Sequence, residues 1–238
     1  MPWKDLAYQL IFNIGLLVMI ASMLSQSQRM QEVIVQERRS WKSETFLSIV
    51  FGLIIILSVC TGLNFEDYSI NTRMIGAMTS GLIGGPIVGL FASIIGSGFV
   101  LFTAEPQSFA NAAAFSTMIF GLLGGGFYPY FQRGKWKSRD LFVLACFAEC
   151  AEMVVLLRMN ISVEVLETII SITVPVVLIN AVGILIFVSV FNGVFIRQDI
   201  ESSRQLQIAS KLSQSAMPLL RQGLKRGEEM RELASNVI

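Results

Sequence analysis

The residues of this chain with the clearest chemical potential are charged side chains set among apolar ones. Glu149 and Glu152 are one helical turn apart in the apolar run 140–157, so they share one face of the expected helix. A charged group inside a membrane is costly, rare and usually functional, and it needs a polar partner. We therefore expect a polar binding site inside a membrane, with Arg73 as the basic partner of Glu149.

Arg73 itself has two possible roles. It could clamp an anionic ligand, or it could extend from a helix end to the lipid headgroups, as arginines often do. Asn71 and Thr72 place polar groups directly beside it, which favours the ligand role. The other candidate ligand-binding residues are the glutamates and their possible polar companions: Glu149, Glu152, Ser116, Thr117 and Asn180. A buried structural ion pair or a protonated acid remains the alternative for the glutamates.

Composition excludes several other kinds of chemistry. The chain has no histidine, so histidine acid–base catalysis, histidine metal ligation and a phospho-accepting histidine are all excluded in this chain. Its cysteines, Cys60, Cys146 and Cys150, fall inside apolar runs and are expected to be buried packing residues. The formal net charge of +1 indicates no nucleic-acid partner. We expect no enzyme activity in this chain, no metal and no cofactor.

The overall balance of residues is that of a membrane protein. Apolar residues form 53% of the chain and charged residues 15%. Apolar runs long enough to cross a bilayer occupy 6–24, 46–63, 109–131, 140–157 and 167–196. No A-x-A-like cleavage site follows the first run, which is therefore expected to be a retained helix.

A further apolar run, 69–102, is too long for one ordinary crossing, and Gly84-Gly85-Pro86 divides it. It could form one long kinked helix or two short helices that turn at this break. Short, interrupted helices are tolerated in a membrane only where protein or a water-filled cavity surrounds them. Gly81 and Gly89, with the residues of the break, are expected to let helices pack closely.

The distribution of basic residues favours two helices, because cytoplasmic loops collect Lys and Arg. With a hairpin in 69–102, the loops 25–44 and 131–139 and the C-terminal tail fall on one side. The two loops then hold Arg29, Arg38, Arg39, Lys42, Arg133, Lys135, Lys137 and Arg139, against Lys4, Arg73 and Arg158 on the other side. A single crossing gives a nearly even split. We therefore predict seven crossings, with the N-terminus outside and the C-terminus cytoplasmic.

The tail 197–238 is polar and helix-prone. An apolar stripe that includes Leu206, Leu212 and Leu219 recurs at helical spacing. We predict a cytoplasmic helix over 198–217 that pairs with its copy in a homodimer. The alternative is a solvated helix without a signalling role.

Several motifs occur together along the chain: Asn71-Thr72-Arg73, GLIGGPIVG at 81–89, GLLGG at 121–125, Ala148-Glu149, and Pro175 with Asn180 and Gly183. In the tail, IAS at 208–210 is followed by Pro218 and LRQGL at 220–224. In these motifs the chain resembles the five-transmembrane receptor domain of the LytS/YhcK type and its linker helix. One difference is that the family usually has a second arginine in a GG-x-x-R-type motif, where this chain has Val100.

The resemblance implies a multi-pass bacterial sensory input domain in the cytoplasmic (inner) membrane. In that family the linker leads to a histidine kinase or a diguanylate cyclase domain, so we expect a receptor truncated before a missing output domain. It also implies a fold similar to the substrate-capture subunits of energy-coupling vitamin transporters. The expected ligand is a small molecule, anionic or zwitterionic.

The expected architecture is therefore an all-α polytopic membrane bundle with a Gly/Pro-broken helical hairpin and a C-terminal cytoplasmic helix. Its expected parts are an N-terminal transmembrane helix (1–30), the membrane receptor domain (31–196) and the signalling linker helix (197–238). The alternative function is that of a substrate-capture subunit of an energy-coupling transporter, although such a subunit has no need of the long polar tail.

Overall fold

The computed structural model describes residues 3–35, 39–65, 68–103, 107–132, 137–158, 173–193 and 207–208. The chain divides into two units, Met1–Asn192 and Gly193–Ile238, and the fold below is that of the first. The tail helix predicted over 198–217 lies outside the described residues except for positions 207–208, and it stays a prediction.

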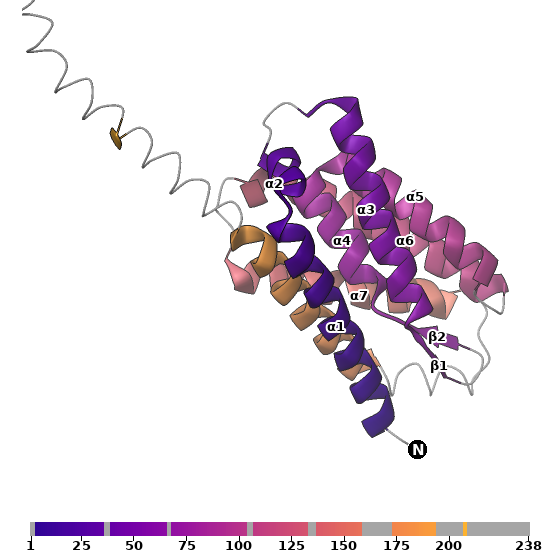
Figure 1. Ribbon diagram of the computed structural model, residues 1–238. Helices are drawn as coiled ribbons and strands as arrows, with labels where there is room; N and C mark the ends of the chain where they lie inside the picture. Colours follow the sequence, from indigo (N-terminus) through magenta and orange to yellow (C-terminus); the bar gives the residue numbers. More distant parts are fainter. Residues whose placement is uncertain are drawn as a thin grey trace, which may run out of the picture. The chain divides into compact units, whose positions relative to one another are not determined.

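The fold class predicted from the sequence, an all-α polytopic bundle, is confirmed. The helices are α1 (Trp3–Gln26), α2 (Gln28–Val35), α3 (Trp41–Cys60), α4 (Arg73–Gly84), α5 (Pro86–Thr103), α6 (Gln107–Gln132), α7 (Ser138–Arg158) and a further helix, Thr173–Gly193. Figure 1 shows the last of these in orange. A short antiparallel ribbon of β1 (Leu63–Phe65) and β2 (Tyr68–Ile70), which was not predicted, joins α3 to α4.

Among the described residues, five helices are long and apolar enough to cross a membrane. They are Tyr8–Gln26, Trp41–Cys60, Pro86–Thr103, Phe109–Gln132 and Thr173–Gly193. α4 has only 12 residues, and α7 carries Arg139, Asp140, Glu149 and Glu152. The prediction of seven crossings counts these two helices as well, and it stays a prediction.

The hairpin predicted in 69–102 is confirmed. α4 ends at Gly84, Gly85 has a φ of 89° that glycine adopts without strain, and Pro86 begins α5. The two helices run antiparallel, because Gly81 lies against Gly89 while Gly76 and Gly96 both contact Ile55 of α3. The arms are unequal, at 12 and 18 residues, because the β-ribbon takes up the start of the apolar run.

Glycines allow α4, α5 and α6 to touch backbone to backbone. A Cβ atom added at Gly81 would collide with the backbone of Gly121 and Gly125, and one added at Gly89 would collide with the carbonyl oxygen of Gly121. Every residue of α4 is buried. The small residues at helical spacing in these segments therefore form a close-packed three-helix contact, as such residues do in membranes.

Arg39, just before α3, holds the tip of the hairpin. Its guanidinium donates hydrogen bonds to the carbonyl oxygens of Ile83 (3.0 Å) and Gly84, which end α4 without partners in the helix. It also donates to the carbonyl oxygen of Ile34 (2.7 Å) in α2, and it lies over the Tyr128 ring of α6 at 5.5 Å. The loop before α3, the hairpin tip and the end of α6 therefore share one end of the bundle.

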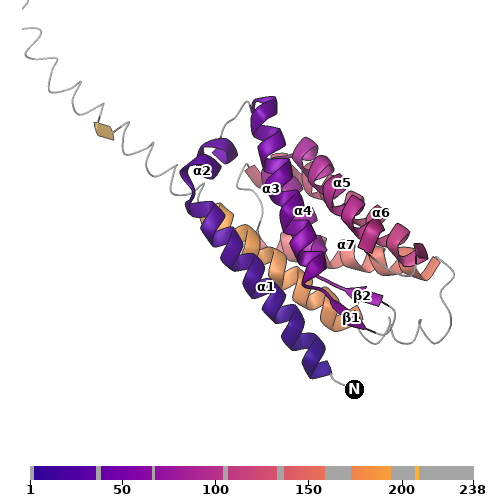
Figure 2. The same ribbon diagram turned by 45° about the vertical axis from the view of Figure 1, so that its right-hand side comes forward.

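The β-ribbon and the N-terminus lie at the opposite end (Figures 1 and 2). This places Arg39 and the C-terminal end of α6 at the same end, which agrees with the common side that the charge pattern predicted for 25–44 and 131–139. Which end is cytoplasmic stays a prediction.

α1 and the helix Thr173–Gly193 run side by side in both views (Figures 1 and 2). Leu10 packs against Val176. Gly183 has no side chain, so the side chains of Ile14 of α1 and Ile75 of α4 can pack directly against its backbone. The rings of Phe187 and Phe191 pack at tilted angles against the ring of Phe51 of α3, with centroids 6.5 and 6.0 Å away. The last described helix is thus packed into the same core as the hairpin.

Candidate functional site: a buried polar centre

Arg73, the first residue of α4, is buried inside the bundle and lies at the middle of a polar network. Its Nε donates to Thr117 Oγ1 (3.1 Å) and its Nη1 to Asn71 Oδ1 (3.0 Å). Its Nη2 forms an ion pair with Glu152 Oε1. Every nitrogen of the guanidinium therefore already donates to the protein, and the side chain does not extend to the headgroups.

Local backbone structure positions this arginine. Asn71 Oδ1 also accepts the backbone N–H of Arg73 (3.1 Å), so a single amide oxygen holds both the first turn of α4 and the guanidinium. Thr72 is the N-cap residue, but its side chain makes no capping bond, and its Oγ1 is buried without a hydrogen-bond partner. The β-ribbon ends directly before these residues and so sets where α4 begins.

α6 supplies two hydroxyl groups on adjacent residues. Ser116 Oγ donates to Glu152 Oε1 (2.7 Å), and Thr117 Oγ1 donates to the carbonyl oxygen of Ala113 (2.6 Å) while it accepts from Arg73. Because Thr117 uses its proton on its own helix, its oxygen is fixed as an acceptor for the guanidinium. The ion pair is thus surrounded by hydrogen bonds.

Glu149, one turn before Glu152, has a different partner from the one expected. Arg73 pairs with Glu152, whereas Asn180 Nδ2 of the helix Thr173–Gly193 donates to Glu149 Oε1. Glu149 and Asn180 are each only 1% exposed. Asn180 Oδ1 is buried and has no hydrogen-bond partner.

We call this network the polar centre. The structure brings together all eight residues predicted as ligand-binding, every one of them buried: Asn71, Thr72, Arg73, Ser116, Thr117, Glu149, Glu152 and Asn180. The centre joins α4, α6, α7 and the helix Thr173–Gly193 through side-chain contacts. The predicted break and packing residues, Gly81, Gly84, Gly85, Pro86 and Gly89, form the hairpin that presents Arg73.

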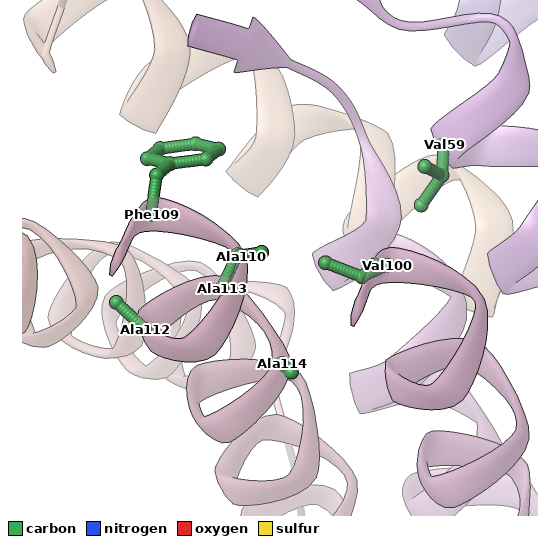
Figure 3. Packing of buried hydrophobic residues seen from close by; sticks show 7 residues of the cluster. All are labelled: Val59, Val100, Phe109, Ala110, Ala112, Ala113 and Ala114. Atoms are coloured by element: carbon green, nitrogen blue, oxygen red, sulfur yellow. The ribbon is translucent and has the colours of Figure 1, made fainter. Parts of the chain in front are cut away.

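An apolar wall around Val100 lies next to the polar centre. Val100 is 2% exposed and belongs to a cluster with Val59 of α3, Phe109 and several alanines of α6. Figure 3 shows Val59 and Val100 facing these alanines. Ala113 belongs to this wall and also accepts the Thr117 hydroxyl, so the wall and the polar centre adjoin on α6.

The sequence did not reveal two residues of structural importance. In the sequence Arg39 is one of several basic residues in its loop, and Asn13 is a single polar residue within an apolar run. Asn13 is fully buried, and its Nδ2 donates to the carbonyl oxygen of Thr61 (2.7 Å), the C-cap of α3. A buried asparagine within the apolar run 6–24 was the signal that could have identified it.

Among the described residues, no three or more His, Cys, Asp and Glu side chains gather in a group that could hold a metal ion. The expectation of buried cysteines was wrong for two of the three. Cys60 and Cys150 are exposed and Cys146 is half-buried, because these positions face outward from α3 and α7.

The fold and the polar centre define a polytopic helical membrane protein with a buried charged core. A match to the family described as "5TMR of 5TMR-LYT" covers residues 27–194. The chain belongs to this family of five-transmembrane receptor domains, and it is accordingly a membrane sensory input domain. The match begins after α1.

Relatives named "Sensor histidine kinase/phosphatase LytS" from Staphylococcus aureus strains RF122, Mu50 and N315 are each 25% identical to the chain over 242 residues. The matches cover 93% of this chain and 41% of each relative, so the chain spans less than half the length of these proteins. No solved structure matches the chain.

Proposed function

We propose that this membrane domain binds a small ligand at the polar centre and passes a conformational signal to a cytoplasmic output domain. The observation that supports this most is the Arg73–Glu152 ion pair, buried where α4, α6 and α7 meet. A buried ion pair is weak evidence for stability, because desolvation offsets its attraction. Charged groups kept inside a membrane bundle are by default functional.

The break in the hairpin supports a ligand site at this position. In membrane proteins, interrupted helices present polar groups and helix ends to bound substrates. Here the break makes α4 a short helix whose residues are all buried by protein, and the first turn of that helix carries Arg73 beside Asn71 and Thr72. The ligand is a small molecule with charged groups, anionic or zwitterionic.

The route of the signal runs through Asn180. This residue is the polar link between α7 and the helix Thr173–Gly193, and the polar segment 197–238 follows that helix in the sequence. A ligand that changes the Glu149–Asn180 contact would shift this helix relative to α7. We propose that the shift acts on a histidine kinase/phosphatase, the activity in the relatives' names, within a homodimer. The domain itself has no enzymatic role in this scheme.

The test is a thermal-stability screen of the purified chain in nanodiscs against anionic and zwitterionic metabolites. Ligands that bind the native state raise the unfolding temperature with concentration. The double variant Arg73→Gln/Glu152→Gln removes both charges and leaves neither one unpaired, so we expect it to fold. It should lose the ligand-induced shift.

Arg139→Gln, a change in an exposed arginine of α7, is the matched control and should keep the shift. The proposal would be contradicted by hits that stabilise the double variant as much as the parent. A screen with no stabilising ligand at all would also count against it.

Signal transmission has its own readout. Cysteines placed at Leu206 or Leu212 should cross-link between two copies of the chain in membranes. We expect a hit from the screen to change the cross-linking rate in the parent and not in Asn180→Leu. Equal changes in both proteins would rule out the route through Asn180.

A further inference from the structure

The polar centre holds more acidic groups than basic ones. Arg73 pairs with Glu152, whereas the side-chain partner of Glu149 is the neutral amide of Asn180. Within the part of the chain that the structure describes, no basic side chain forms an ion pair with Glu149. The centre therefore holds two carboxyl groups and one guanidinium, all buried.

Asn180 also carries an unused hydrogen-bond acceptor. Its Nδ2 donates to Glu149 Oε1, which leaves its Oδ1 free to bind another group. That oxygen is an acceptor without a donor, and it belongs to a residue that is only 1% exposed. Thr72 Oγ1, beside Arg73, is also without a partner. Buried polar groups are nearly always paired, so such atoms point to a missing group.

An anion alone would fit this arrangement poorly. To bind Arg73 it would have to displace Glu152, Thr117 or Asn71 from a guanidinium whose nitrogens all donate already. Displacing Glu152 would leave a buried carboxylate unpaired, which is strongly unfavourable. A cation, in contrast, would place a positive charge beside Glu149. It would also give Asn180 Oδ1 the hydrogen-bond donor or the coordinated ion that this oxygen lacks.

We propose that the polar centre binds a monovalent cationic group, seated between Glu149 and Asn180 Oδ1. The group is either the primary ammonium of a small organic ligand or an alkali metal ion, since both are recognised by carboxylate and amide oxygens. This inference deepens the proposed function and rests on it, because it names the charge class that the site takes. It favours a zwitterion over a plain anion.

The test uses small probes that differ only in charge. The purified chain in nanodiscs, in an amine-free buffer, is titrated with propylammonium, β-alanine and propionate, and its unfolding temperature is measured. A separate arm replaces potassium chloride by sodium or lithium chloride at constant ionic strength. If the site takes an ammonium group, propylammonium and β-alanine should stabilise the protein. If it takes an alkali ion, one of these ions should stabilise the protein more than the others. We expect propionate to have no effect in either case.

Variants assign the effect to the site. Glu149→Gln keeps a hydrogen bond to Asn180 and removes the charge, and it should weaken cation binding at least about tenfold. Asn180→Ser keeps the charge and removes the free carbonyl, so it should weaken binding less. Glu32→Gln removes an exposed carboxylate of α2 and is the matched control, which should bind like the parent.

The outcomes separate the two proposals. Stabilisation by propionate alone, lost in Arg73→Gln/Glu152→Gln and kept in Glu149→Gln, would overturn the cation site and leave the proposed receptor function standing. Cation effects that persist undiminished in Glu149→Gln and Asn180→Ser would also overturn it. No stabilisation by any probe, together with an empty metabolite screen, would count against both proposals.

Discussion

At the scale of single residues, the polar centre shows how the environment selects partners among similar groups. Two glutamates one turn apart on α7 could each have taken Arg73, and the side chain that does so is Glu152. Ser116 on α6 donates to Glu152, and Asn180 on another helix donates to Glu149. The hydroxyl on one side and the amide on the other thus give the two carboxyl groups different surroundings.

Val100 offers a prediction at this scale. Val100→Arg places a cation in the apolar wall of Val59 and the α6 alanines, next to the polar centre. Burying an unpaired arginine in a membrane bundle costs about 2.5–3.5 kcal/mol on insertion scales, so the variant should be less stable without ligand. It should also shift ligand preference toward more acidic molecules, because it compensates the surplus carboxylate. Thermal unfolding with and without propionate measures both effects.

The matched control for that variant is Phe102→Arg. Phe102 lies on the same helix and is 92% exposed, so the change adds the same charge without burying it in the wall. If Val100→Arg and Phe102→Arg responded alike to propionate, a role for position 100 beside the site would be excluded.

At the scale of helices, the glycines of α6 give a prediction with its control in the same segment. Gly121→Ala forces a methyl group against the backbone of Gly89 and the side chain of Ser93, whereas a Cβ at Gly126 meets nothing within 4 Å. Overpacking costs about 1–3 kcal/mol. Alanine in an open helix position gains up to about 1 kcal/mol over glycine. Unfolding measurements should therefore show Gly121→Ala destabilised and Gly126→Ala unchanged or stabilised.

Arg39 gives a second prediction for the hairpin. Arg39→Ala removes the donors for the last carbonyl groups of α4 and should cost about 1.5–3 kcal/mol, the usual value for hydrogen bonds to a charged group. Hydrogen exchange at the backbone amides of residues 83–85 should speed up more than exchange in α3. Arg29→Ala, which removes an arginine lying 5.3 Å from the Phe46 ring, is the control and should leave this exchange unchanged.

Some features of the fold and of the polar centre were predictable from the sequence, and others were not. The helix break was predictable because glycine and proline act on the local backbone, and the clustering of the polar-centre residues was predictable because charges in apolar runs must meet. The pairing of Arg73 with Glu152 was not predictable, since spacing puts both glutamates on one face. The β-ribbon and the role of Arg39 depend on contacts distant in sequence, and no local pattern marks them.

At the scale of the whole molecule, the arrangement of helix ends leads to a prediction about sidedness. Arg39, the hairpin tip and Tyr128 share one end, so the loops 25–44 and 131–139 must face the same compartment. Basic residues in both loops predict that this compartment is the cytoplasm. Single cysteines at Ser40 and Lys137 should be protected from an impermeant thiol reagent in intact cells and labelled after lysis. Labelling of either one in intact cells would reject this orientation.

The shortness of α4 has a consequence for biogenesis. Twelve residues of helix extend only about 18 Å, well short of the roughly 30 Å hydrocarbon core, and every one of them is buried by protein. Such a segment has no stable place in lipid when it first leaves the ribosome, and its leading residue is an arginine. We expect α4 to enter the bilayer only when α5 and α6 have been synthesised and can cover it. For this protein, we therefore expect insertion of α4 and tertiary folding to be one event.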